Sequence, residues 1–199
     1  MLSVSLNEVE QISLKAARGA GAGWGVAEDV ARATRWMAER GLDWSAPLLR
    51  LLASGDVAAH LRTAFEIADL LPGARCEERW IIEGCAPVWG LAILSAALYG
   101  RDATLDLAWS GGLARQHAAG GMSADRPLRE LGLFVPERVT VTIGAEAPPL
   151  AHRVTATARR STLETAVWRE IGAYAARTYV AASARSRTAG AGGGRVDDD

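Results

Sequence analysis

The chain has 199 residues, of which 49% are hydrophobic and 23% charged, and its 22 basic and 23 acidic residues leave a formal net charge of -1. This length supports one domain with a sizeable core, and the composition excludes a disordered chain. Because a nucleic-acid binder needs an excess of positive charge, we expect no nucleic acid among the partners.

The sequence predicts a cytoplasmic protein without a membrane partner. Cys76 and Cys85 are the only cysteines. One disulfide cannot organise a domain of this size, so we expect reduced thiols. Residues 1–10 are polar and acidic, unlike a signal peptide. The longest apolar stretch, residues 85–99, is broken by Pro87 and Gly90 and is shorter than the roughly 20 residues of a membrane span.

Apolar residues at helical spacing predict four helices in the first half of the chain, over residues 5–19, 26–40, 45–54 and 57–71. Ser5 and Glu8 have the spacing of a capping box, and Ser45 is the predicted N-cap of the third helix. The glycine-rich residues 19–25 join the first two helices, and we expect Trp24 to plug this turn. A dinucleotide loop would need a strand before it. If an anion binds there, amides of residues 25–27 would hold it.

Strand signals begin in the second half. Short or alternating segments predict strands over residues 80–82, 104–109, 113–117, 139–143 and 154–155. A buried helix is expected over residues 87–99, a flexible loop over 118–126 and a last helix over 161–179. Ser161 and Glu164 have the spacing of a second capping box, which would start that helix.

The predicted fold is therefore α+β, with a helical N-terminal half, a small mostly antiparallel sheet and a closing C-terminal helix. Residues 1–182 are expected to form a single globular domain, with a helical lobe over about 1–72 and a mixed α/β part over about 73–182. Residues 183–199 are rich in Gly and Asp and poor in bulky apolar side chains, which predicts a flexible tail.

Cys85 is the candidate catalytic residue, because it precedes the predicted helix at Pro87 and a helix N-terminus lowers the pKa of a thiol. A nucleophilic thiol also needs a base, and His60, His117 and His152 are the candidates. The alternative, which we favour, is a buried and inert thiol. The histidines lack metal-ligand spacing, so we expect neither a metal nor another cofactor.

Four residues are candidate ligands of an acidic molecule: Arg79, Arg177, Tyr179 and Arg187. Arg177, Arg185 and Arg187 bracket Tyr179 and would form a small anion pocket or a protein contact. The alternative is an arginine that stabilises a helix end. Arg79 follows Glu77 and Glu78, which are candidates for acid-base chemistry or simply a solvated surface.

Several short sequence segments resemble those of a known family. They are residues 17–21, 24–25, 27–28, 85–87, 176–180, 183, 186–187 and 190–192, with the acidic end 197–199. In these segments the chain is similar to a small family of uncharacterised proteobacterial proteins. Its members are about 200 residues long and known only as a domain of unknown function. The resemblance implies a bacterial, cytoplasmic setting and supplies no mechanism.

Two main functional hypotheses follow. The first is a non-catalytic accessory or binding protein in an assembly with itself or another protein, suggested by seven tryptophans and the lack of a recognisable catalytic motif. The alternative is a small-molecule enzyme acting on an acidic metabolite, with Cys85 or a glutamate near Arg79 for chemistry and Arg177 as carboxylate ligand. A transcription regulator is disfavoured, since acidic and basic residues are mixed on the second helix.

Overall fold

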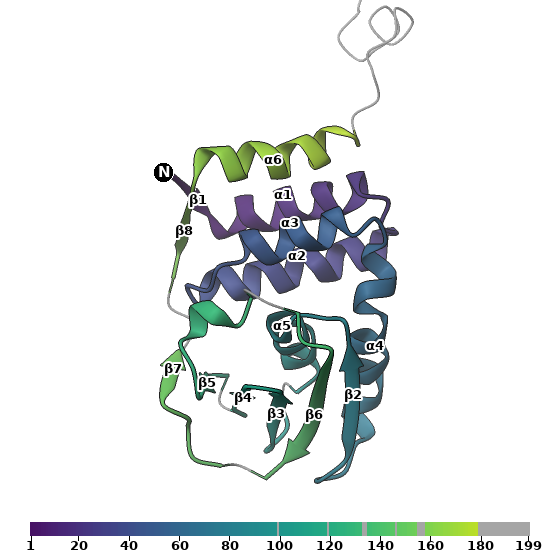
Figure 1. Cartoon of the computed structure of the whole chain (residues 1–199), viewed down its shortest axis with the longest axis vertical. Helices are drawn as coiled ribbons and strands as arrows, with labels where there is room; N and C mark the ends of the chain where they lie inside the picture. Colours follow the sequence, from purple (N-terminus) through teal and green to yellow (C-terminus); the bar gives the residue numbers. More distant parts are fainter. Residues whose placement is uncertain (99, 119, 133–134, 146, 155–157, 179–199) are drawn as a thin grey trace, which may run out of the picture.

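The N-terminal half folds into helices, as predicted: α1 (Leu6–Gly19), α2 (Trp24–Glu39), α3 (Ser45–Ala53) and α4 (Val57–Leu70), followed by the short 3-10 turn η1 (Leu71–Gly73) (Figure 1). The computed structural model describes residues 1–98, 100–118, 120–132, 135–145, 147–154 and 158–178. Among these residues, no helix combines the length and apolarity that crossing a membrane requires.

Helix α6 (Thr165–Ala176) closes the helical layer by packing on α1 (Figure 1). Strand β1 (Leu2–Ser5) precedes α1 and pairs antiparallel with β8 (Arg160–Leu163), which leads into α6. The first capping box is confirmed, because the Ser5 hydroxyl accepts a hydrogen bond from the Glu8 amide at 3.2 Å and the Glu8 carboxylate accepts one from the Ser5 amide at 2.6 Å. The strands that lead into α1 and α6 therefore lie side by side.

The second half forms an antiparallel sheet in the order β2-β6-β3-β4-β5-β7. Its strands are β2 (Arg79–Glu83), β3 (Thr104–Trp109), β4 (Gly112–Gln116), β5 (Met122–Ala124), β6 (Arg138–Gly144) and β7 (His152–Val154), with the 3-10 turn η2 (Leu128–Glu130) between β5 and β6. Together with the helical half and α6, this sheet confirms the predicted α+β class.

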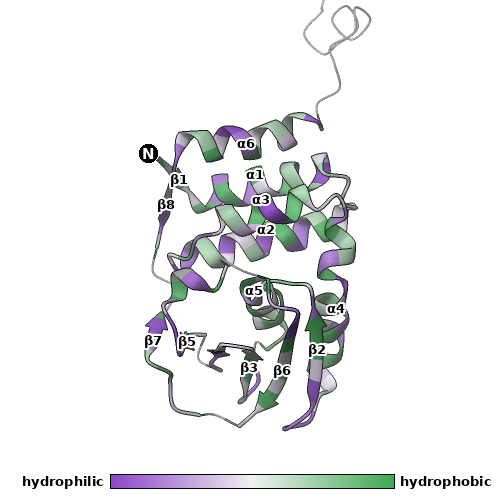
Figure 2. Cartoon of the chain, in the orientation of Figure 1, coloured by the Kyte–Doolittle hydropathy of each residue, from purple (hydrophilic) through white to green (hydrophobic). Residues whose placement is uncertain are grey.

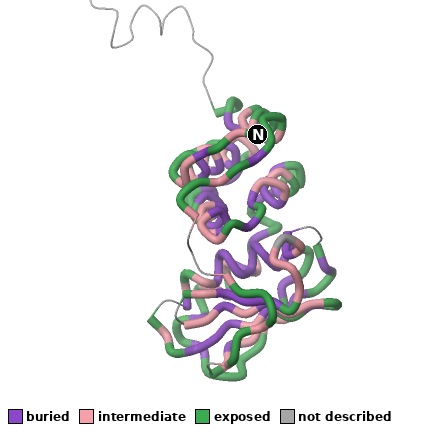
Figure 3. Tube along the Cα trace, turned by 90° about the vertical axis from the view of Figure 1, so that its left-hand side faces the viewer, coloured by how far each residue is buried: buried purple, intermediate pink, exposed green. Residues whose placement is uncertain are grey.

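Helix α5 (Pro87–Ala97) lies between the helical layer and the sheet. Its residues from 87 to 94 are all buried. The ribbon of α5 is coloured mainly hydrophobic in Figure 2, and buried segments fill the middle of the molecule in Figure 3. Close packing on the sheet requires Gly90, because a Cβ atom there would lie 2.8 Å from the Leu107 side chain. The core is thus continuous from the helices through α5 to the sheet.

Three local predictions are wrong. Ser161 does not cap a helix: it lies in β8, its hydroxyl accepts a hydrogen bond from the Trp44 indole at 2.9 Å, and α6 begins only at Thr165. Ser45 is not the cap of α3, since the Asp43 carboxylate accepts hydrogen bonds from the first amides instead. The loop predicted over 118–126 contains β5, whose pairing with β4 overrides its small, polar composition.

The glycine turn is also different from the prediction, because Trp24 does not plug it. The Trp24 side chain is 63% exposed, and the Arg18 guanidinium lies 4.8 Å from its ring centroid. The close approach is instead made by Gly19, where a Cβ atom would overlap the carbonyl oxygen of Tyr174 in α6.

We therefore predict that Gly19→Ala lowers the free energy of unfolding by about 1–3 kcal/mol, because α1 and α6 must move apart to admit the methyl group. Gly25→Ala is the matched control: nothing lies within 4 Å of the new methyl group in α2, so alanine is expected to be neutral or slightly stabilising. Urea unfolding of both variants measures the difference. Equal stabilities would contradict the close α1–α6 contact.

Candidate functional site

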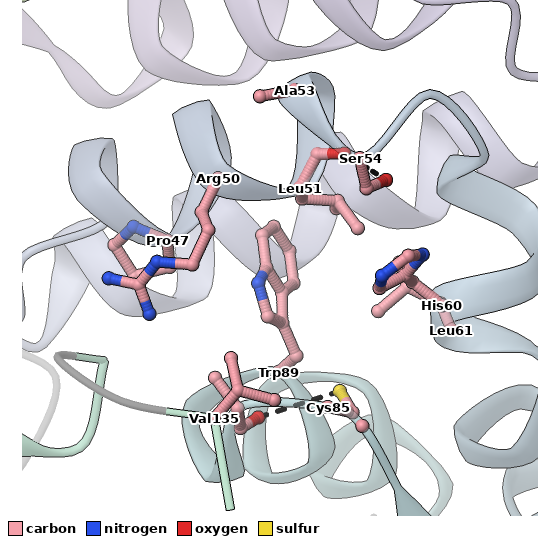
Figure 4. Close-up of a pocket in the computed structure, with 12 residues that line it drawn as sticks. Pro47, Arg50, Leu51, Ala53, Ser54, His60, Leu61, Cys85, Trp89 and Val135 are labelled. Atoms are coloured by element: carbon pink, nitrogen blue, oxygen red, sulfur yellow. Dashed lines mark hydrogen bonds between the residues drawn. The ribbon is translucent and has the colours of Figure 1, made fainter.

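A pocket of about 330 Å³ opens between α3, the first turns of α4 and the start of α5 (Figure 4). Its wall is mostly apolar, built from Leu51, Leu61, Ala86, Trp89 and Val135. This volume and lining are typical of a small-molecule site, in which a few polar groups orient an apolar ligand.

Three local features of the sequence, a helix cap, a glycine turn and a proline, fix the position of the segments that form the pocket wall. Asp56 caps α4 by accepting a hydrogen bond from the Ala59 amide at 2.9 Å, which fixes the turn that carries His60. Gly84 turns the chain after β2 with φ +62°, a conformation that glycine adopts without strain. Pro87 then occupies the first turn of α5, where its missing N–H costs no hydrogen bond.

Two N–H donors face one side of this pocket. Trp89 stands in the middle of it, and its indole nitrogen is on the ring edge nearer to Arg50 (Figure 4). Within the part of the chain that the structure describes, neither the indole N–H nor the Arg50 guanidinium makes a hydrogen bond or ion pair. Arg50 is exposed at the rim, whereas Trp89 is buried. Both donors are therefore available to an acidic group in the pocket.

Cys85 lines the same pocket but is almost fully buried. Its thiol donates a hydrogen bond to the Ala86 carbonyl oxygen at 3.5 Å. Burial raises the pKa of the Cys85 thiol from 9.0 to about 12, and the Gly90 amide offsets this only in part. At neutral pH the residue is thus a neutral thiol, which favours the inert alternative. Its catalytic role stays a prediction.

The three histidines lie in different places. His60 lines the pocket with Cys85, and its Nδ1 is 3.1 Å from the Asp56 carbonyl oxygen. His117 follows β4, and its Nε2 lies 2.9 Å from the Ser123 hydroxyl. His152 is exposed on β7. Of the candidate bases, the structure brings only His60 into the pocket of Cys85. Among the described residues no cluster of three metal-ligating side chains occurs.

The predicted arginine ligands are not part of this pocket. Arg79 is exposed at the start of β2 in the sheet, while Arg177 follows α6 in the helical layer and stacks on Tyr174 at 4.3 Å from the ring centroid. Tyr179 and Arg187 lie outside the described residues. The structure therefore does not bring Arg79 and Arg177 together, and the ligand-binding roles of the four residues stay predictions.

Sequence reasoning missed Arg50 and Trp89. A signal for Arg50 was present, since it is the only charged residue in the leucine-rich α3. Trp89 gave none, because a tryptophan in an apolar helix is typical of a core position. Their proximity depends on the position of α3 and α5 on opposite sides of the pocket (Figure 4), which spacing along the chain does not reveal.

The model of a family described as Protein of unknown function (DUF3726) matches residues 4–80. The predicted resemblance to a domain of unknown function is thus confirmed for the segment from β1 to the first residues of β2, which supplies the α3 and α4 walls of the pocket. No curated protein and no solved structure matches the chain.

The burial of Cys85 predicts selective labelling. In the native protein, iodoacetamide at pH 8 is expected to modify the exposed Cys76 and to leave Cys85 unmodified, with both thiols reacting after unfolding. Mass spectrometry of the wild type and of Cys76→Ser measures this. Rapid native labelling of Cys76→Ser would contradict the burial of the second thiol.

The raised pKa of Cys85 also predicts a pH dependence of stability. Above pH 9.0 the thiol ionises in the unfolded chain, whereas in the native protein it stays protonated up to about pH 12. The free energy of unfolding should therefore fall with rising pH in this window, by up to about 1.4 kcal/mol per pH unit from this group. Cys85→Ala should lack this component, so the stability difference between the two proteins should shrink as pH rises.

Proposed function

We propose that the protein is a non-catalytic binding protein that works in an assembly and holds, in the pocket between α3, α4 and α5, a small molecule with an apolar body and an acidic group. The observation that carries this proposal is that two hydrogen-bond donors, the Arg50 guanidinium and the Trp89 indole N–H, face the same side of an apolar pocket. The proposal sets the protein in the cytoplasm, where both thiols remain reduced.

The apolar wall supports burial of the ligand's body. Each Å² of apolar surface removed from water contributes about 25 cal/mol, so a small hydrocarbon group gains binding energy from Leu51, Leu61 and Val135. The open rim lets such a molecule enter without unfolding α3, since Arg50 and Val135 are both exposed.

The polar side of the pocket supports an acidic group on that ligand. A guanidinium forms charge-assisted hydrogen bonds with a carboxylate, and an indole N–H adds a donor only. Neither group can accept a hydrogen bond, so this side of the pocket favours an anion over an alcohol or an amine. A monocarboxylic acid with a branched or aromatic body matches both sides.

The chemistry of Cys85 supports binding rather than catalysis, because its thiol is neutral at physiological pH. One observation keeps the enzyme alternative as a second candidate: Cys85 and His60 line the same pocket. In that case the bound acid would be a substrate, and loss of the thiol would abolish turnover.

A thermal-shift screen with apolar monocarboxylates tests the binding proposal. A ligand at 100 times its Kd should stabilise the fold by about 2.7 kcal/mol. Arg50→Gln is expected to weaken binding about tenfold, the loss of roughly 1.4 kcal/mol of charge-assisted hydrogen bonding. Arg62→Gln, an exposed arginine of α4 outside the pocket, is the control and should bind like the wild type.

Two results would overturn this proposal. If no monocarboxylate raises the melting temperature, or if Arg50→Gln binds the best ligand as tightly as the control does, the pocket does not recognise an acid through Arg50. Conversion of the bound ligand by the wild type and not by Cys85→Ala would replace the binding function by the enzyme alternative.

A further inference from the structure

Strand β2 is one edge of the six-stranded sheet, and its partner on the inner side is β6 (Figure 1). Hydrogen bonds at both ends of the pair fix which backbone groups point inward. The Ile143 amide donates to the Glu78 carbonyl oxygen at 3.2 Å, and the Gly84 amide donates to the Glu137 carbonyl oxygen at 3.4 Å. The even-numbered residues of β2 therefore bond to β6.

Because hydrogen bonding alternates along an antiparallel strand, the backbone N–H and C=O groups of Arg79, Ile81 and Glu83 point away from β6. Within the described part of the chain, these backbone groups have no other hydrogen-bond partner. An edge of this kind is a template for one more strand.

The side chains of the same three residues lie on the open face of the sheet. Arg79 and Glu83 are exposed, and Ile81 lies between them with 45% exposure. The Glu83 carboxylate also lies 3.8 Å from the Arg138 guanidinium of β6, in an ion pair that is open to solvent. The alternate residues face the core: Ile82 is buried and Trp80 is half-buried. The edge thus presents a positive, an apolar and a negative side chain at successive outward positions.

We propose that β2 pairs antiparallel with β2 of a second copy of this chain, about a two-fold axis at Ile81. In this register Ile81 faces Ile81, and Arg79 of each copy faces Glu83 of the other. All outward N–H and C=O groups of the three residues then find partners, and opposite charges meet directly across the strands, which stabilises a pair of strands. The two sheets join into one.

The charge pattern is what selects a second copy as the partner. A strand with arginine at one end and glutamate at the other is complementary to itself only in the antiparallel direction, and such a self-complementary contact closes as a dimer. Growth toward the N-terminal side is limited by a bulge, where Glu77 and Glu78 both face Ile143: the Glu77 amide, at φ +72°, donates to the Ile143 carbonyl oxygen, and the Ile143 amide donates to the Glu78 carbonyl oxygen. The opposite edge, β7, has only three residues.

This inference deepens the assembly part of the proposed function by naming the partner, and it does not depend on the pocket ligand. Its test measures mass, whereas the ligand test measures melting temperature, so either can fail while the other holds.

The experiment is a charge-swap series on the full chain, measured by size-exclusion chromatography with light scattering. The wild type is expected to have twice the mass of one chain at about 100 μM, a concentration that populates dimers of micromolar Kd. Arg79→Glu places two carboxylates opposite each other at both ends of the contact, and Glu83→Arg places two guanidinium groups there. Each variant alone should run at half the mass of the wild type.

Mixing the two single variants gives the decisive result, because in a mixed pair every position 79 again faces an opposite charge at position 83. The mixture, and the double variant Arg79→Glu/Glu83→Arg, should regain the doubled mass. Arg153→Glu makes the same charge change on β7 and should remain dimeric. Circular dichroism of each variant checks folding, and Ile81→Lys offers a second disruptive change at the axis.

Three results would overturn the proposal. They are a wild type with the mass of one chain, folded single variants that keep the doubled mass, and a mixture of the single variants that fails to regain it.

Discussion

The burial of α5 is the constraint on which the rest of the structure depends. A helix that is apolar all round must be covered on every side, and here α2 and α4 cover one side while the sheet covers the other. Gly90 lets α5 approach the sheet, where its missing Cβ makes room for Leu107 and Ile82. The position of α5 against the sheet also places the Trp89 side chain between α5 and α3 (Figure 4). The pocket is therefore a consequence of how the core is closed rather than a separate addition.

The link between the helices and the sheet is reinforced by one buried charge. Arg40, at the end of α2, donates hydrogen bonds to the carbonyl oxygens of Trp36 at 3.2 Å and Gly120 at 3.1 Å, and its guanidinium lies 4.0 Å from the Trp36 ring centroid. Burial lowers the pKa of Arg40, which is the electrostatic cost of this bridge. A guanidinium stays charged at that position because of its very high ordinary pKa. A lysine there could neutralise instead and would lack the planar stack.

The fold was predictable wherever the signal is local. The capping box of Ser5 and Glu8, and the alternation of β3 and β6, are confirmed. Predictions failed where contacts between residues distant in sequence determine the local structure. Strand β5 forms because β4 and β7 pair with it, and Ser161 lies in a strand, where its hydroxyl accepts a hydrogen bond from the Trp44 indole. The candidate site shows the same division. Cys85 could be singled out by its place before a helix, but its burial, and the fact that it lines one pocket with Arg50, depend on packing between segments that are distant in sequence.

Access to solvent distinguishes the groups that can serve a ligand or partner from those that serve the fold. The Ser123 hydroxyl lies 2.9 Å from His117 Nε2, as a nucleophile and its base would. However, Ser123 is completely buried, and its hydroxyl accepts a hydrogen bond from the Leu150 amide at 3.0 Å. This pair therefore fastens β5 to the segment before β7. The Arg50 guanidinium at the pocket rim and the outward N–H and C=O groups of β2 differ from this buried pair. They reach solvent and can still form hydrogen bonds with a ligand or a partner. The binding and pairing that we propose thus use two surfaces whose polar groups reach solvent, and both surfaces are held in place by the core.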